Sequence, residues 1–358
     1  MAVKKIMLWP SARSKFVKDD HMILIYKSLL VLSAFMVVSN FYMYSFMYAV
    51  KLLLMIVLAI FVTKEVEILF YSHDKEIDRV QAKELIEKSY FRVTALIYVL
   101  LIPIGTPLWL VGIGAALGTL LGKLLFGGFA HMVFHTSLVG VMFVTLGWQQ
   151  LVDGVGFITS FDNYLLTLLF DNNFFNNTLA IGGIFDPNNY TSALGMLANG
   201  DMYDFLDVFL GLTPGIVGNG IVLLAIFAFL LYKKAVNYIV PVTLLSSFFV
   251  TALIIGLVNG EGIMYPIYHL FTGSLLFVTI FVSTDPITTP VPTKGKILFG
   301  IIAGALAMFI RNGVKFEEGI IFAVLFMSML TPMINTEMKK KKKPIPKKDP
   351  KPVVKAGE

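Results

Sequence analysis

Long apolar runs, separated by shorter polar segments, dominate this chain of 358 residues. A helix needs about 20 mostly apolar residues to cross the hydrocarbon core of a bilayer. Ten runs approach or reach that length: 22–44, 46–70, 91–105, 107–126, 129–148, 207–232, 236–258, 264–284, 296–312 and 317–335. The third ends in Pro-Ile-Gly-Thr-Pro, which favours a tilted or broken helix. The pattern predicts an all-α polytopic membrane protein with about ten transmembrane helices.

The positions of lysine and arginine predict the orientation of these helices, because short basic loops stay on the cytoplasmic side. Basic clusters precede the first run and follow the second, fourth, sixth, eighth and tenth runs. Residues 124–232 contain no lysine or arginine, so the longest loop, 149–206, is expected outside the cytoplasm. Arg311 and Lys315 depart from this pattern, with two glutamates beside them. We expect a protein of the cell inner (cytoplasmic) membrane with both termini in the cytoplasm.

The apolar runs and the positions of the charges divide the chain into three parts. Residues 1–21 form a cytoplasmic N-terminal segment, residues 22–335 form the transmembrane domain, and residues 336–358 form a lysine-rich cytoplasmic tail. The formal net charge of the whole chain is +6, and the nine lysines and three acidic residues of the tail account for all of it. The positive charge therefore does not indicate a nucleic-acid partner. It suits a solvated tail near anionic lipid.

Composition removes several classes of function. Hydrophobic residues make up 57% of the chain and charged residues 15%, whereas soluble domains contain about 25% charged residues. A soluble enzyme of this length is therefore excluded. The chain has no cysteine, which excludes disulfides, thiolate metal sites and cysteine-ligated iron–sulfur clusters within this sequence.

The fifth run contains two histidines and is directly preceded by the pair Gly127-Gly128. His131 and His135 are four residues apart, so in a helix they would share one face. A haem or metal pair would need further ligands from elsewhere in the bundle, whereas interfacial histidines need only backbone partners. We assign no metal site, and the role of the two histidines stays open.

Asp285 lies in Ser283-Thr284-Asp285-Pro286 at the end of the eighth run. Polar groups inside a membrane are costly, so each is a functional candidate. The carboxylate of Asp285 would accept a proton or coordinate a cation beside freed backbone carbonyls. Alternatively, Asp285 caps a turn and Pro286 ends the helix. The sequence leaves both interpretations open.

Eight blocks of sequence carry a family resemblance over roughly residues 90–335. They are 122–128 (Gly-Lys-Leu-Leu-Phe-Gly-Gly), 134–140 (Phe-His-Thr-Ser-Leu-Val-Gly), 209–215 (Phe-Leu-Gly-Leu-Thr-Pro-Gly), 239–241 (Ile-Val-Pro), 269–273 (His-Leu-Phe-Thr-Gly), 283–290 (Ser-Thr-Asp-Pro-Ile-Thr-Thr-Pro), 294–300 (Lys-Gly-Lys-Ile-Leu-Phe-Gly) and 318–323 (Glu-Gly-Ile-Ile-Phe-Ala). In this order they resemble the family that unites the D component of the Rnf ion-translocating electron transport complex with the B component of the sodium-pumping NADH:quinone reductase. The resemblance implies two inverted five-helix repeats of the urea-transporter type.

The same resemblance implies a covalent FMN on the outer loop. In the family, a threonine in Asp-x-x-Ser/Thr-Gly-Ala-Thr-Pro-Leu carries the flavin through its phosphate. The corresponding stretch here is 186–194, and counting from either end places Ser192 at that position, with Thr191 as the other candidate hydroxyl. The stretch departs from the pattern, because Asn189, Tyr190 and Thr191 stand where the family has Ser, Gly and Ala. Asp285 is a further cofactor-binding candidate, and a second, noncovalent flavin is also compatible with the resemblance.

These implications favour a membrane subunit of an Rnf-type complex that relays electrons through flavin and couples them to ion movement. The partners would be the other subunits, a flavin transferase and the lipid bilayer. The chain holds no complete active site of its own. Two alternatives are a channel or secondary transporter for a small solute, and a flavin-free structural subunit of the complex.

Overall fold

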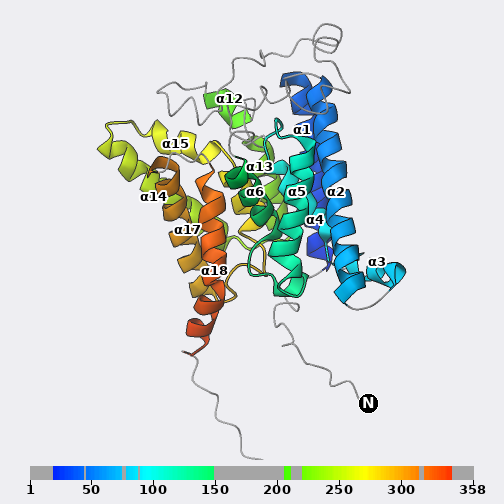
Figure 1. The fold of residues 1–358 in the computed structure, drawn as a ribbon. Helices are drawn as coiled ribbons and strands as arrows, with labels where there is room; N and C mark the ends of the chain where they lie inside the picture. Colours follow the sequence, from blue (N-terminus) through cyan, green and yellow to red (C-terminus); the bar gives the residue numbers. More distant parts are fainter. Residues whose placement is uncertain are drawn as a thin grey trace, which may run out of the picture.

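The computed structural model describes residues 19–43, 46–74, 78–87, 89–148, 205–210, 220–313 and 318–340. All regular structure in these residues is helical, so the predicted all-α class is confirmed for them (Figure 1). Among these residues, four helices are long and apolar enough to cross a membrane, or five if one bent pair counts as a single span. The protein is therefore a multi-pass membrane protein.

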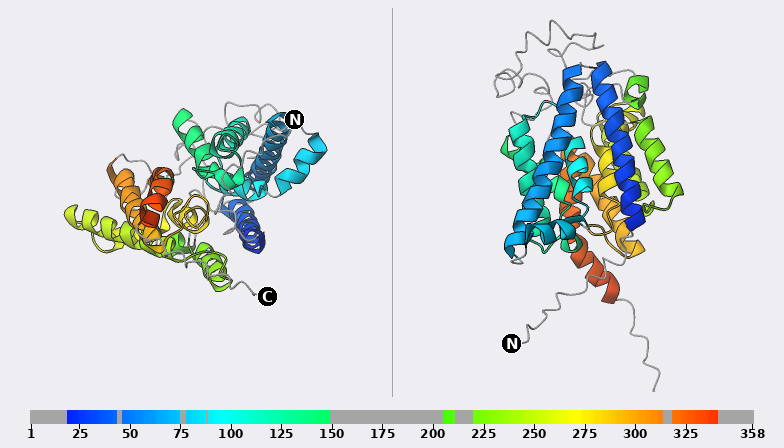
Figure 2. Two further views of the ribbon diagram at one scale, coloured as in Figure 1. Left: turned by 90° about the horizontal axis from the view of Figure 1, so that it is seen from below. Right: turned by 90° about the vertical axis from the view of Figure 1, so that its right-hand side faces the viewer.

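The first group of elements forms one side of the molecule (Figures 1 and 2). It contains α1 (Asp19–Met43), α2 (Phe46–Asp74), α3 (Arg79–Glu87), α4 (Phe91–Leu100), α5 (Leu108–Thr119), the π-helix η2 (Leu120–Leu124), the 3-10 turn η3 (Phe129–His131) and α6 (Thr136–Gly147). Helix α5 packs against α6, and α2 contacts α1, α4 and α5.

The second group contains α12 (Phe205–Leu210), α13 (Ile221–Tyr232), α14 (Ile239–Val258), α15 (Met264–Phe271), α16 (Leu275–Phe277), the π-helix η5 (Val278–Val282), α17 (Thr293–Gly313) and α18 (Gly319–Lys340). Helix α17 packs between α14 and α18, and these three lie together opposite α2–α6 (Figures 1 and 2). Contacts of α1 with α13 and of α18 with α6 join the two groups.

Two short apolar segments form the centre of the molecule. Residues 93–107, which include most of α4, are all buried, and so are residues 274–283, which include α16 and η5. A helix that is apolar on every side is stable only where other helices surround it. In contrast, the outer helices expose apolar side chains such as Val57 and Phe61 of α2, as lipid-facing helices do. The helix break at residues 272–274 and the residue Asp285, both described below, lie at the two ends of the segment 274–283.

Glycines allow α5 and α6 to approach closely. Gly114, Gly118 and Gly122 are spaced by four residues, so they line one face of α5 and η2. A methyl group on Gly118 would lie 2.8 Å from the Cα atom of Gly140 in α6. Small residues at this spacing are typical of tightly packed membrane helices.

The structure corrects three expectations. The run 129–148 forms a helix only from Thr136, because His131 ends the η3 turn and His135 is the extended residue before α6. The prediction that His131 and His135 share a helical face is therefore wrong. The run 207–232 contains two separate helices, α12 and α13, and the basic loop after α2 contains the unpredicted helix α3.

Candidate functional site at the break between two membrane helices

The eighth apolar run is broken near its middle, between α15 and α16. Thr272 has an extended backbone and Gly273 has φ of 68°, a left-handed conformation that suits glycine. The two halves, Met264–Phe271 and Leu275–Val282, are bent by 65° relative to each other. Such a break leaves backbone carbonyls at the end of α15 and backbone N–H groups at the start of α16 without helical partners.

Arg311 of α17 satisfies the carbonyl side of the break. Its Nη1 atom donates to the His269 carbonyl at 2.8 Å, and its Nη2 atom donates to the Thr272 carbonyl at 3.3 Å. The side chain is buried and also lies over the Phe248 ring, 5.2 Å from its centroid. A cation is favourable there because the C-terminal end of a helix carries partial negative charge.

Glu318, which precedes α18, satisfies the other side of the break. Its carboxylate accepts hydrogen bonds from the Ser274 amide, at 3.1 and 3.2 Å, and from the Ser274 hydroxyl. An anion is favourable there because the N-terminal end of a helix carries partial positive charge. Arg311 and Glu318 therefore provide hydrogen-bond partners for the two helix ends at the break. Both residues lie where the pattern of basic loops has its exception, and this exception was the sequence signal for their role.

Three buried side chains near the break have polar groups with no hydrogen-bond partner among the described residues. These groups are both ring nitrogens of His269 and the hydroxyls of Thr272 and Thr279. The ring of Tyr265 packs against His269, with the ring centroids 4.3 Å apart. Buried polar groups are usually hydrogen-bonded, so unpartnered groups at this depth mark a place where water or a small solute would find partners.

Asp285 lies at the other end of the segment, just after η5. Its Oδ2 atom accepts hydrogen bonds from the Thr288 amide at 3.1 Å and from the Thr288 hydroxyl at 2.9 Å. These are the turn contacts that the capping interpretation expects. A π-helix is rare and is frequent at functional sites, and both η2 and η5 end within a motif of the resemblance or directly before one.

The same carboxylate also shares a small cavity with His135, which comes from the first group of elements. Asp285, Thr284, Tyr90 and His135 line this cavity of about 20 Å³. His135 is buried, and its Nδ1 atom has no partner among the described residues. The sequence did not place these motifs together. A space of this size holds a water molecule, whereas pockets for drug-sized ligands measure about 300–1,000 Å³.

Lys123 is the basic residue at the end of the fourth apolar run, where the charge pattern predicted a cytoplasmic loop. The structure buries it instead. It is fully buried and pairs with Glu67 of α2, with 2.6 Å between Nζ and Oε1. The Nζ atom also donates to the carbonyl and the hydroxyl of Ser89, and that hydroxyl donates to Glu67. Glu67 lies within an apolar run, and this was the signal in the sequence that could have revealed the pair.

The predicted flavin-bearing residues, Ser192 and Thr191, lie outside the described residues, as does most of the loop 149–206. Of the three residues singled out for cofactor binding, the structure therefore places Asp285 alone.

Comparison with known protein families gives one match over most of the chain, because residues 13–343 match the family described as NQR2, RnfD, RnfE. The D component of an ion-translocating oxidoreductase complex from Actinobacillus succinogenes is 31% identical over 270 residues, which cover 68% of this chain and 74% of the relative.

Two further relatives are the B components of Na(+)-translocating NADH-quinone reductases. The protein from Pseudomonas paraeruginosa is 32% identical over 254 residues, and the protein from Chromohalobacter salexigens is 29% identical over 253 residues. Each match covers 68% of this chain. The matched region spans only 58% and 57% of these two relatives.

Proposed function

We propose, since the chain belongs to the NQR2, RnfD, RnfE family, that it is the membrane subunit of an Rnf-type ion-translocating electron transport complex. In this role it relays electrons through flavin and couples their flow to ion movement. The names of its relatives support the role, because they describe components of an ion-translocating oxidoreductase complex and of a Na(+)-translocating quinone reductase. The other subunits of the complex take electrons from the soluble donor.

The broken helix pair α15 and α16–η5 is the observation that carries this proposal. Helices broken within the membrane place partial charges and unpaired backbone groups at the depth where transporters bind ions. Here Arg311 of α17 and Glu318, which precedes α18, form hydrogen bonds with the backbone at the break, where the two halves are bent by 65°. His269, Thr272 and Thr279 lie beside the break with polar groups that have no hydrogen-bond partner among the described residues and are available to an ion or water. A static packed helix would need none of these groups.

The wider architecture belongs to the same proposal. It includes ten spans in two inverted repeats of five helices, in the inner membrane, with both termini in the cytoplasm. The basic residues before the first run and after the second, sixth, eighth and tenth runs support this orientation. Four apolar helices of 10–17 residues, added to the four long spans and the bent pair, supply further candidates for these spans.

A covalent FMN on Ser192 or Thr191 belongs to the proposal as well, and it would be attached by a flavin transferase outside the cytoplasm. Such a group supplies one-electron chemistry, while the protein positions and buries it. Asp285 lines a cavity of about 20 Å³, which holds no flavin by itself, while its neighbours Thr284 and Pro286 also line a cavity of about 700 Å³. Asp285 therefore remains a candidate for coupling and for cofactor binding.

Peptide mass spectrometry tests the flavin assignment. The full chain is produced with its partner subunits and the transferase, and the 186–199 region is analysed. We expect the mass of FMN on this peptide, lost in Ser192→Ala and kept in Thr191→Ala. Loss in the second variant alone would move the site to Thr191. An unmodified peptide, in a preparation whose partner subunit carries flavin, would favour the flavin-free structural subunit.

The assembled complex tests the role of Asp285. Asp285→Asn keeps the oxygen that caps the turn and removes the charge, so the complex should assemble and lose electron transfer or its ion dependence. Thr288→Val is the matched control, because it removes the 2.9 Å hydroxyl contact and keeps the charge. Normal turnover in Asp285→Asn would leave Asp285 with the capping role alone.

A further inference from the structure

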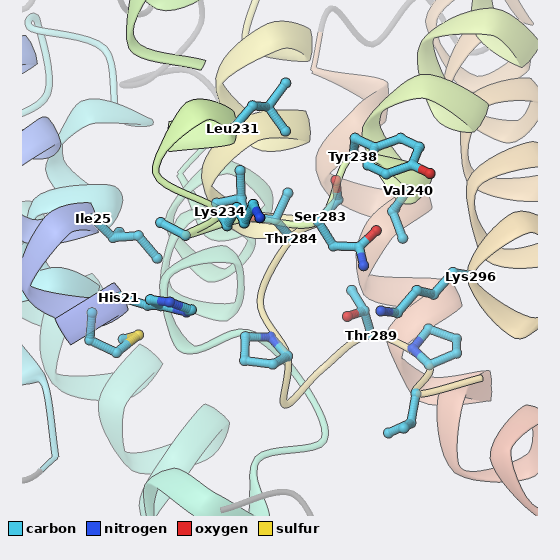
Figure 3. Close-up of a pocket in the computed structure, with 17 residues that line it drawn as sticks. His21, Ile25, Leu231, Lys234, Tyr238, Val240, Ser283, Thr284, Thr289 and Lys296 are labelled. Atoms are coloured by element: carbon cyan, nitrogen blue, oxygen red, sulfur yellow. The ribbon is translucent and has the colours of Figure 1, made fainter. Parts of the chain in front are cut away.

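A large cavity lies beside the same central segment and adjoins the small cavity of Asp285, with which it shares Met22, Ile25, Thr284 and Pro286. It measures about 700 Å³ and is formed by the start of α1, the turn between α13 and α14, residues 283–291 and the start of α17. Figure 3 shows His21, Lys234 and Lys296 around it, together with Tyr238 and Thr289. Its size falls in the range of small-molecule sites.

The charge of this cavity is unbalanced. Three basic side chains, His21, Lys234 and Lys296, line it, and no carboxylate of the described residues does. Neither lysine forms an ion pair within the described part of the chain, where the lysine in an ion pair is Lys123. Two ammonium groups that share a partly enclosed space repel each other, so an anion between them would relieve this cost.

The backbone at Lys234, whose side chain is partly exposed beside the cavity, is unusual. Helix α13 ends with the Lys234 amide donating to the Leu231 carbonyl and the Ala235 amide donating to the Leu230 carbonyl. This is a Schellman ending, in which the left-handed residue is usually glycine. Lys234 occupies that position with φ of 55°. A lysine at this position costs backbone strain, which suits a side chain needed for contact.

The remaining wall is apolar and continues toward lipid-facing surface. Met22, Ile25 and Leu231 line the cavity. Beside them, Ile23 of α1 and Phe229 of α13 are 48% and 45% exposed on the outer surface. A ligand for this space therefore has an anionic group at one end and a hydrocarbon body at the other.

We propose that this cavity binds an anionic phospholipid, with its phosphate between Lys234 and Lys296 and an acyl chain along α1 and α13. Basic pockets between membrane helices on the cytoplasmic side suit such head groups. A free phosphate would leave the apolar wall exposed to water, and an uncharged isoalloxazine ring would leave the two ammonium groups unbalanced. The phospholipid satisfies both ends.

Thermal unfolding of the full chain in dodecyl maltoside tests this site. Dioleoyl phosphatidylglycerol is titrated, with dioleoyl phosphatidylcholine as the comparison, and tryptophan fluorescence gives the unfolding temperature. We expect saturable stabilisation by phosphatidylglycerol, weakened roughly tenfold in apparent affinity by Lys234→Gly and by Lys296→Gln. Lys234→Gly is the sharper variant, because glycine suits the left-handed position and should preserve the fold without lipid.

Lys233→Gln is the matched control, since Lys233 is exposed in the same turn, as Lys234 is, but does not line the cavity. It should bind phosphatidylglycerol as the unmodified chain does. Equal stabilisation by the two lipids, or unchanged affinity in both Lys234→Gly and Lys296→Gln, would overturn the proposal. Stabilisation by FMN or inorganic phosphate that depends on the two lysines, without any by phosphatidylglycerol, would assign the site to a soluble phosphate instead.

Discussion

Replacing Lys123 by methionine should destabilise the protein severely, because it leaves the carboxylate of Glu67 buried without its cation. Both side chains are 0% exposed, and the two charged atoms are 2.6 Å apart. Removing one partner of a buried ion pair costs about 3–5 kcal/mol. The Ser89 hydroxyl still donates to Glu67, but a neutral hydroxyl does not replace an ammonium group.

Removing both charges should restore much of this loss. In Lys123→Met with Glu67→Met, no buried charge remains, and buried ion pairs replaced by apolar residues are often neutral. The Ser89 carbonyl, which accepts from Lys123 at 2.8 Å, would then lose its partner, at about 1–3 kcal/mol. We therefore expect the double variant to lie between the unmodified protein and Lys123→Met in its free energy of unfolding.

Helix α2 offers an internal control two residues away. Glu65 pairs with Arg79 at 3.1 Å, but the side chains are 31% and 60% exposed. An exposed pair of this kind contributes about 0–1 kcal/mol, so Arg79→Gln should change little. Unfolding of the purified chain in mixed micelles, titrated with dodecyl sulfate, measures all the variants. The reasoning fails if Lys123→Met costs no more than Arg79→Gln, or if the double variant is no more stable than Lys123→Met.

Three further predictions concern packing, the helix break and topology. Gly118→Ala should destabilise the protein by about 1–3 kcal/mol, because its methyl group would lie 2.8 Å from the α6 backbone. Gly112→Ala on the same helix should be tolerated, because the nearest atom to its methyl group is 3.9 Å away. Thermal unfolding distinguishes the two variants. Arg311→Gln should cost about 3 kcal/mol in the same assay, because two carbonyls at the break lose a charged donor; an unchanged unfolding temperature would refute the capping role. Asn172→Cys should react with a membrane-impermeant maleimide in intact cells and Lys341→Cys should not; the opposite labelling would reverse the orientation.

Most of the long helices could be predicted from the sequence, because a membrane helix must be apolar over the thickness of the bilayer. The run 236–258 corresponds to Ile239–Val258, and the run 296–312 corresponds to Thr293–Gly313. The break after the third run was also predictable, since Pro103 and Pro107 cannot continue a helix. The family match likewise confirms the resemblance read from short blocks of sequence.

The helix ends near the motifs were less predictable. The run 129–148 is apolar enough for a helix throughout, yet its first residues form a turn that follows Gly127 and Gly128, which have φ of 97° and 98°. Apolar run length records only where a side chain tolerates lipid. It does not record where the backbone changes direction, so His131 and His135 were assigned to one face incorrectly.

The sequence by itself determined which segments are apolar enough to enter a membrane, because that depends on the composition of each segment alone. Only the tertiary structure decided which polar groups meet. Lys123 and Glu67 are 56 positions apart, and Ser274 and Glu318 are 44 apart, so no local pattern links either pair. Each pair exists because packed helices bring a charge to a group that would otherwise be buried without a partner, and burial without a partner is too costly to persist.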